Sequence, residues 1–295
     1  MNDRDYLAQQ FEAQRTRLRS VAYRMLGSLS EAEDAVQEAW LRCSQADTDE
    51  IENMQAWLTT IVARISLNVL RSRNVRPEAA LDPHVPDPLV SPADGPDPEQ
   101  QALVADAVGL ALQVVLDTLG PAERLAFVLH DMFEIPFEQI APIVGRSPTA
   151  ARQLASRARR RIRGQAPVSD SDLITQRRAV DAFFAAAHDG EFDRLVAVLD
   201  PDVALRSDGG ALRSASSVVI HGAEAVAARA MTFARFAPYV RPALVNGAAG
   251  VVVADGDQIR AVIGFTVVGG LIVEVNALSD PERLSQLDLG ALVDG

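Results

Sequence analysis

The clearest indication of a chemical function comes from six arginines in one short segment, residues 148–163. They stand at positions 152, 157, 159, 160, 161 and 163, and the segment contains no acidic residue. Guanidinium groups form bidentate hydrogen bonds with phosphates and with the O6/N7 edge of guanine. A run of positive charge without a balancing acid therefore predicts a contact with nucleic acid.

The residues around these arginines have the signals of a helix-turn-helix. An apolar stretch, Phe137–Val144, ends at Gly145, which can adopt the positive φ of a tight turn between helices. Ser147 is a good N-cap and Pro148 suits the first helical position, so a second helix should begin there. Early residues of such a second helix reach base edges, and later arginines meet phosphates. The alternative is a packed helical hairpin whose basic face is only solvated.

A second stripe of polar and aromatic side chains lies along a helix expected at 54–73. Its members are Trp57, Thr60, Arg64, Asn68 and Arg71. An aromatic ring, hydrogen-bonding groups and cations on one face suit single-stranded DNA, because rings stack on bases while cations follow the phosphates. The alternative is that Trp57 belongs to the core.

Residues 31–44 predict an amphipathic helix with an acidic outer face. Ala32, Val36 and Ala39 share one side at helical spacing. The opposite stripe consists of Asp34, Gln37, Glu38 and Leu41. An apolar residue among acids suits an anchored contact with a basic helical partner. The alternative is a solvated surface helix.

Composition excludes several classes of protein. The 295 residues include 48% hydrophobic residues and a single cysteine, so neither global disorder nor an internal disulfide is expected. We expect no metal site, no cofactor and no membrane span, and the N-terminus lacks the layout of a signal peptide, which favours a cytoplasmic protein. The net charge of −12 argues against strong unaided DNA binding by the whole chain.

The chain divides into compositional blocks that predict a multidomain fold. Two all-α domains, the second with the helix-turn-helix, should occupy 1–76 and 101–164. Residues 77–100 hold seven prolines and six acids without an arginine, which predicts an extended linker and not a packed element. After a second linker at 165–172, helices mixed with β-branched runs over 173–295 predict an α+β domain with antiparallel hairpins.

Two segments near the N-terminus resemble the most characteristic part of sigma-70-type sigma factors of the compact extracytoplasmic-function group. They are Ala22-Tyr-Arg-Met-Leu-Gly27 and Ala32-Glu-Asp-Ala-Val-Gln-Glu-Ala-Trp-Leu-Arg42. The stretch from Leu119 through Ala158 also resembles the domain of that family that reads the −35 element. The resemblance implies a factor that directs core RNA polymerase to promoters.

The resemblance also implies roles for individual residues. Docking on the clamp helices of the β′ subunit would fall to Asp34, Gln37, Glu38 and Leu41. Contacts with the −10 element would fall to Trp57, Thr60, Arg64, Asn68, Arg71 and Arg73. Contacts with the −35 element would fall to Ser147, Thr149, Arg152, Gln153, Ser156, Arg157 and Arg160. The β flap is the second expected polymerase contact.

The C-terminal block is similar to the SnoaL-like, cone-shaped barrel, a fold that hosts both enzymes and binding modules. Sigma factors with this extension carry regulatory motifs that match Ser207–Arg213 and Ser279–Leu284 here, and a linker motif that matches Val85–Leu89. The resemblance implies control in cis through an intramolecular contact at Asp208, Gly209, Gly210, Asp280 and Pro281.

Two other functions stay open at this point. One is a DNA-binding regulator with a ligand-sensing domain, which would bind its operator without polymerase. The other is an enzyme that uses a C-terminal pocket, for which an acid or base would be required. The available candidates are Asp181, His188, Asp208 and His221.

Overall fold

The computed structural model describes residues 3–46, 51, 53–74, 84–93, 109–165, 167, 169–170, 172–210, 216–256, 258–287 and 289. Contacts divide the chain into two compact units. We call residues 1–78 with 115–165 the helical unit, and residues 79–114 with 166–295 the sheet unit. The two helical modules expected from the sequence thus share one unit, and the segment expected as a linker belongs with the C-terminal domain.

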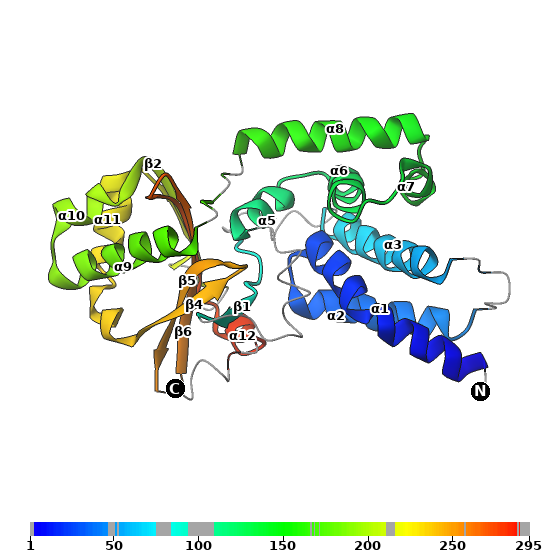
Figure 1. The fold of residues 1–295 in the computed structure, drawn as a ribbon, viewed down its shortest axis with the longest axis horizontal. Coiled ribbons are helices and arrows are strands. Elements are labelled where there is room, and N and C mark those ends of the chain that lie inside the picture. The colour runs from blue at the N-terminus through cyan, green and yellow to red at the C-terminus, as the bar shows by residue number, and fades with distance from the viewer. Residues whose placement is uncertain are drawn as a thin grey trace. The chain divides into compact units, whose positions relative to one another are not determined.

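Helices alone build the described part of the helical unit (Figure 1). The first three are α1 (Asp3–Leu26), α2 (Leu29–Cys43) and α3 (Met54–Asn74). They are followed by the end of α5 (Leu110–Asp117), by α6 (Pro121–Phe127), which continues into a π-helical turn (Val128–Met132), and by α7 (Phe137–Val144) and α8 (Pro148–Gln165). Local signals set the boundaries: the Ser28 hydroxyl accepts a hydrogen bond from the Glu31 N–H at the start of α2, and Gly145 ends α7 with a φ of 68°.

The first and second helical modules are joined by hydrogen bonds from arginines to backbone carbonyls. Arg124 of α6 donates through Nε to the carbonyl oxygen of Arg24, at 3.0 Å. Arg17 of α1 donates to the carbonyl oxygen of Phe133, at 3.3 Å. Because Arg124 is also buried and paired with Asp117, this junction is a specific contact between the two modules.

The sheet unit contains a seven-stranded sheet in the order β1-β4-β5-β6-β7-β2-β3. The strands are β1 (Val90–Pro92), β2 (Leu199–Asp208), β3 (Val218–His221), β4 (Val240–Val245), β5 (Ala248–Asp255), β6 (Gln258–Val268) and β7 (Leu271–Leu278). All neighbours are antiparallel except β2 and β7, which are parallel. The sheet is open, so the expected barrel is corrected to a cone-like fold with two edges.

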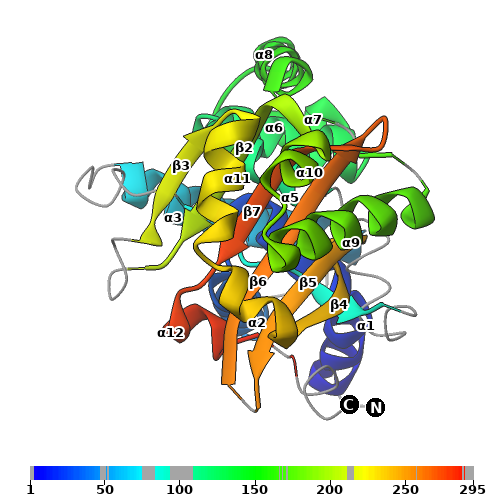
Figure 2. The same ribbon diagram turned by 90° about the vertical axis from the view of Figure 1, so that its left-hand side faces the viewer.

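Helices cover one face of this sheet (Figure 2). They are α9 (Leu173–Asp189), α10 (Phe192–Ala197) and α11 (Ala223–Met231), followed by a 3₁₀ helix (Ala234–Tyr239). Val180, Leu195 and Phe265 are buried in the core between the helices and the sheet. A shorter helix, α12 (Pro281–Leu284), follows β7, and its Leu284 packs in a second core on the other face.

The expectation of an unpacked linker is wrong for residues 84–92. Strand β1 pairs with β4 in antiparallel register, with Val90 opposite Val245. Val85 and Val90 lie in the second core of the sheet unit, and Leu89 is buried as well. Proline is tolerated in β1 because this strand is an edge of the sheet. The remaining residues of 77–100 lie outside the described ones.

Candidate functional site

The acidic face expected on α2 is exposed as the sequence predicts. Asp34, Gln37 and Glu38 are exposed, and 59% of Leu41 is accessible to solvent. The opposite side of the helix is buried through Ala32, Ala35, Val36, Ala39 and Cys43. Glu38 forms an ion pair with Arg42 one turn later, and such exposed pairs stabilise a helix by only about 0.3–0.5 kcal/mol. The face can therefore exchange this pair for a partner's charges at small cost.

The stripe expected on α3 is also largely accessible. Arg64, Asn68 and Arg71 are exposed, and Trp57 is half-buried, so its ring is available in part for stacking. Thr60 donates its hydroxyl hydrogen to the carbonyl oxygen of Ala56, at 2.8 Å. These five residues do form one stripe.

Arg73, the sixth residue expected to contact the −10 element, is exposed but forms contacts with other residues of the helical unit. It donates a hydrogen bond to the carbonyl oxygen of Leu26, at 3.1 Å, and it pairs with Glu31 of α2. These contacts tie the end of α3 to the junction between α1 and α2. A DNA contact by Arg73 would have to compete with them.

The helix-turn-helix expected over 137–163 is formed by α7 and α8. Ala151, Ala155 and Ala158 bury one side of α8. The residues expected to contact the −35 element, Ser147, Thr149, Arg152, Gln153, Ser156, Arg157 and Arg160, are all exposed. The Arg152 guanidinium lies over the Phe137 ring, 5.1 Å from its centroid, which orients this side chain near the turn.

The arginine-rich helix is less unbalanced than its own sequence suggests. Arg157 pairs with Glu123 at 2.8 Å, Arg159 with Asp131 at 2.5 Å, and Arg161 with Glu123 at 3.6 Å. The acids come from α6 and the π-helical turn, so tertiary packing supplies the counter-charges that α8 lacks. Among the described residues, Arg152, Arg160 and Arg163 have no carboxylate partner, so these three carry the charge available to phosphate.

A hydrogen-bonded network in the sheet unit holds the segment 84–92. Asp208, at the end of β2, accepts a hydrogen bond from the Val85 N–H at 3.1 Å and another from Arg283 Nη1 at 2.7 Å. Arg283 also donates through Nε to Asp87 at 2.7 Å and through Nη2 to the Val85 carbonyl oxygen at 2.6 Å. We call Asp87, Asp208 and Arg283 the linker clamp.

The segment is held at its other end by the turn between β4 and β5. The Leu89 N–H donates to the side-chain oxygen of Asn246 at 3.0 Å, and the Asn246 N–H donates to the Leu89 carbonyl oxygen at 2.7 Å. Asn246 has a φ of 50° and Gly247 a φ of 78°, the backbone of a tight hairpin turn. The turn thus presents one side chain and one N–H to the segment.

The clamp stabilises Asp208 in its ionised form. Burial raises the pKa of this carboxyl group, but hydrogen bonds from His84 and from the N–H groups of Val85 and Gly210, with the charge of Arg283, outweigh it and lower the pKa from 3.8 to about 2. Asp87 and Asp208 are both buried, at 4% and 6% exposed. Two buried carboxylates sharing one guanidinium require that guanidinium to stay in place.

The residues expected in a cis-regulatory loop surround this clamp, and only Asp208 belongs to it. Gly210 has a φ of 66°, and a Cβ there would collide with the carboxyl group of Asp280. Asp280 accepts a hydrogen bond from the Glu282 N–H at 2.9 Å and Pro281 is the first residue of α12, so both help to begin the helix that carries Arg283. The Gly209 N–H donates to Ser217.

Sequence reasoning did not single out the other residues of the network, His84, Asp87 and Arg283. The available signal was an acid between two prolines in Val85–Leu89 and an arginine in Ser279–Leu284. Opposite charges in two short motifs could have suggested a pair, but 196 positions separate Asp87 from Arg283.

The residues proposed for catalysis do not come together. Asp181, His188 and His221 are exposed, and Asp208 is occupied in the clamp. A cavity of about 360 Å³ opens between the sheet and its covering helices, and its described lining contains no carboxylate or imidazole. Within the described residues no three His, Cys, Asp or Glu side chains are grouped to hold a metal ion, and no helix is long and apolar enough to cross a membrane.

Known proteins match both the sequence and the fold. Residues 11–76 match the model for sigma-70 region 2, and residues 109–162 match the model for sigma-70 region 4. The ECF RNA polymerase sigma factor SigJ of Mycobacterium tuberculosis is 36% identical over 289 residues, which cover 94% of this chain and 92% of SigJ. The chain belongs to the ECF RNA polymerase sigma factors.

A second relative and the crystal structure of SigJ also match nearly the whole chain. The probable ECF RNA polymerase sigma factor SigI of M. tuberculosis is 32% identical over 97% of this chain and 98% of its own length. The crystal structure of SigJ superposes with a TM-score of 0.77 at 34% identity, over 96% of this chain and 99% of that chain. The similarity therefore extends through the C-terminal domain.

Family membership establishes the function at the level of the whole chain. This sigma factor binds core RNA polymerase and promoter DNA, and it directs transcription initiation. Its family consists of transcription factors that are not enzymes. The faces on α2 and α3 fall in region 2, and α8 falls in region 4.

Proposed function

We propose that the C-terminal domain of this sigma factor restrains it in cis by holding the interdomain segment 84–92 in the linker clamp. The observation that carries this proposal is the guanidinium of Arg283, which bonds Asp208 and, at the same time, Asp87 and the Val85 carbonyl oxygen. Through it, the segment that connects region 2 to region 4 is fixed to the domain that follows both.

The contact between regions 2 and 4 explains how the restraint acts. The −10 and −35 elements lie about 25 base pairs apart, or roughly 85 Å at 3.4 Å per base pair. Two modules that touch each other through Arg124 and Arg17 cannot reach both elements at once. They must separate on the promoter, and the chain between them has to span the gap. A clamp that holds residues 84–92 shortens the chain that is free to span it, which favours the arrangement in which regions 2 and 4 stay in contact.

We also propose residue roles for the exposed faces. Asp34, Gln37, Glu38 and Leu41 dock on the β′ clamp helices, and region 4 meets the β flap. Trp57, Arg64, Asn68 and Arg71 contact the melted −10 strand, while Thr60 and Arg73 serve mainly to shape α3. Ser147, Thr149, Arg152, Gln153, Ser156, Arg157 and Arg160 contact the −35 element, with Arg157 exchanging Glu123 for phosphate. All of these residues are exposed except Trp57 and Thr60, which are half-buried, and this exposure supports the roles.

We further propose that the C-terminal domain performs no catalysis and that the chain works in the cytoplasm, where bacterial polymerase transcribes. The dispersal of Asp181, His188 and His221 over exposed positions supports the first point. General acid–base chemistry requires such groups within hydrogen-bond reach of a bound substrate.

Run-off transcription with purified core polymerase tests the restraint. Arg283→Gln leaves Asp87 and Asp208 without their shared cation, which should cost the docked segment about 3–5 kcal/mol. We expect a several-fold rise in transcript and faster hydrogen exchange at the amides of Val85 and Leu89. Arg194→Gln is the matched control, because Arg194 is exposed in the same unit and its one carboxylate partner among the described residues is Glu191.

Asp87→Asn removes the other charge of the same pair. It should also raise the transcript level and accelerate hydrogen exchange at Val85 and Leu89. If exchange accelerates in both variants while transcript levels stay at the wild-type value, the clamp holds the segment but does not regulate initiation. A fall in transcript would mean that the docked segment is needed for activity, which contradicts the restraint.

A further inference from the structure

None of the described residues that line the cavity in the sheet unit is among those assigned above to polymerase or promoter binding. It measures about 360 Å³, within the range of small-molecule sites, and lies between the sheet and the helices that cover it. Its walls come from α9, α11, the 3₁₀ helix and strands β2, β4, β5, β6 and β7, together with residues just after β7. All of these belong to the same unit, so the cavity is a property of the C-terminal domain itself.

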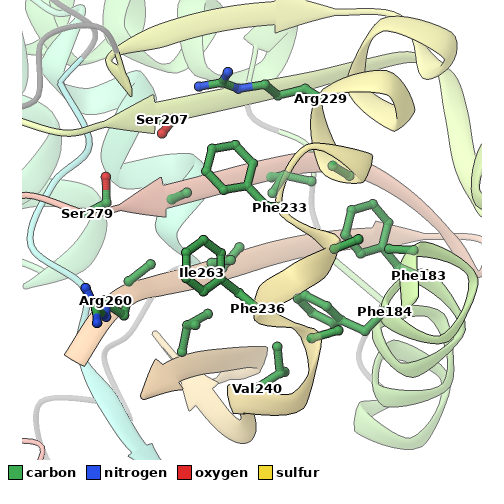
Figure 3. Close-up of a pocket in the computed structure, with 18 of the residues that line it drawn as sticks. Phe183, Phe184, Ser207, Arg229, Phe233, Phe236, Val240, Arg260, Ile263 and Ser279 are labelled. Carbon is green, nitrogen blue, oxygen red and sulfur yellow. The ribbon is translucent and has the colours of Figure 1, made fainter. Parts of the chain in front are cut away.

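One end of the cavity is aromatic (Figure 3). Phe183 and Phe184 of α9 and Phe265 of β6 contact one another edge to face, with ring centroids 5.3–5.9 Å apart. Phe233 and Phe236 stack on each other, with ring centroids 6.4 Å apart, and Phe233 is 44% exposed although it is a large apolar ring. A preformed aromatic surface of this kind favours the apolar body of a ligand.

The other end of the cavity is polar and positively charged. Ser207, Ser279 and Arg260 lie there, and the guanidinium of Arg229 points toward the same end (Figure 3). Three arginines and no acid stand among the described lining residues. The charge at this end is therefore not neutralised by the lining of the cavity.

The two arginines at this end keep guanidinium N–H groups available for a ligand. Arg229 has no carboxylate partner among the described residues and lies over the Phe233 ring, 4.8 Å from its centroid. Arg260 has one ion pair, with Asp255 at 3.1 Å, and its Nε–H is buried without a hydrogen-bond partner in the part of the chain that the structure describes. A buried donor without a partner is costly, and the positive charge of both side chains favours an anion at this end of the cavity.

We infer that this cavity binds an amphipathic carboxylate, with an acyl or aryl body among the phenylalanines and a carboxylate head at the polar end, which Arg229 and Arg260 make positively charged. Guanidinium groups form charge-assisted, bidentate hydrogen bonds with carboxylates, and the hydroxyl of Ser207 is placed to donate another. A neutral apolar molecule would leave these donors unused. A cation of the same shape would be repelled by them.

The polar end of the cavity lies directly behind the linker clamp. Successive residues of a strand point to opposite faces of a sheet, so Ser207 faces the cavity while Asp208 faces the segment 84–92. Ser279 lines the cavity and bonds the Asp208 carbonyl oxygen through both its N–H, at 2.7 Å, and its hydroxyl, at 3.2 Å. A carboxylate that draws on Ser207 or Ser279 therefore shifts the backbone that carries Asp208. This coupling rests on the restraint proposed above, whereas the binding site does not.

Calorimetric titration of the intact chain with three probes that share a ten-carbon chain tests the site. We expect decanoate to bind saturably, 1-decanol to bind at least tenfold more weakly, and decyltrimethylammonium not to bind. Arg229→Gln combined with Arg260→Gln should remove the preference for decanoate over decanol. Arg194→Gln should leave it unchanged. Ala230→Phe, which fills the cavity from α11, should abolish binding of decanoate while the circular dichroism spectrum stays unchanged.

Equal affinity for decanoate and decanol, or a preference that survives in the double arginine variant, would overturn the assignment of the site. The coupling has its own measurement, the exchange rate of the Val85 and Leu89 amides with and without decanoate. We expect at least a threefold change on binding, and binding without such a change would refute the coupling. Neither result depends on the transcription assay, so a failure of the proposed restraint is recognised separately.

Discussion

Arg283 donates a hydrogen bond from Nε to the carboxylate of Asp87, 2.7 Å away, across 196 positions of the chain. Asp87 lies between regions 2 and 4 of the sigma factor, and Arg283 lies on α12 at the far end of the C-terminal domain. Because both side chains are largely removed from solvent, the pair is sensitive to the loss of either member. This one contact links the segment between the promoter-reading regions to a domain that carries its own cavity.

The acidic face of α2 should control polymerase affinity. We expect Asp34→Asn combined with Glu38→Gln to weaken binding to core polymerase by about 1–2 kcal/mol, roughly tenfold, because charges at the rim of an interface contribute modestly. Both side chains are exposed, so the melting temperature should not change. Fluorescence anisotropy with labelled core enzyme measures the affinity.

Glu12→Gln is the matched control for this face, since Glu12 is an exposed acid of α1 whose one ion-pair partner in the described part of the chain is Arg15. If the double variant and the control bind core polymerase equally well, the face on α2 is not the docking surface.

Trp57 should act in promoter melting after polymerase is bound. Trp57→Ala removes a ring whose stacking on a base is worth about 1–3 kcal/mol, whereas Trp57→Phe keeps an aromatic face. We expect permanganate reactivity of thymines in the −10 region to fall for the alanine variant and to be largely retained for the phenylalanine variant. Reduced reactivity together with lost polymerase binding would instead mark Trp57 as part of the core.

Arg152 should read a base in the −35 element. Arg152→Ala is expected to cost about 1–3 kcal/mol of holoenzyme binding and to relax the preference at one position. Arg163→Ala, at the end of the same helix, should weaken binding to all sequences about equally because a phosphate contact carries no base information. Competition binding with single-base variants of the −35 element separates the two effects.

The ionised form of Asp208 should make the sheet unit less stable in acid. Its pKa is lowered from 3.8 to about 2 in the clamp, so its contribution is complete above about pH 4 and is lost as the pH falls through about 2. The shift corresponds to roughly 2 kcal/mol. The unfolding free energy of wild type should exceed that of Asp208→Asn at pH 7, and this difference should close between about pH 4 and 2.

Pulsed hydrogen–deuterium exchange across a urea titration measures the stability of this unit in the intact chain. The readout is the deuterium uptake of peptides from β2 and β7. Asp202→Asn is the control, because Asp202 is an exposed acid on the same strand. A difference between wild type and Asp208→Asn that stays constant down to pH 2 would contradict the lowered pKa.

Helices were largely predictable from local sequence because their signals repeat within a few residues. The apolar spacing of 31–44, the cap at Ser147 and the turn at Gly145 are each confirmed, and the helix expected at 54–73 is observed as Met54–Asn74. The hairpins from β5 to β7 were also expected, since their β-branched runs are separated by clear turns.

Strands with weak local signals were missed. Leu199–Asp208 contains Pro201 and several charges, and its place in the sheet depends on β3 and β7 on either side. Strand β4 was missed although Asn246-Gly247, a strong hairpin signal, follows it directly. Among the described strands, β1 has β4 as its single partner, and a proline-rich segment gives no local indication that such a partner exists.

The sequence by itself determined the sigma-factor family, the two exposed helical faces and the helix-turn-helix, because each depends on residues that are neighbours in the chain. Only the tertiary structure decided that Glu123 and Asp131 neutralise half of the arginines on α8, and that Arg283 holds the segment at Asp87. Such pairs join residues far apart in sequence. Their formation depends on how whole helices and strands pack against one another. The periodic pattern of the sequence around either residue does not predict this packing.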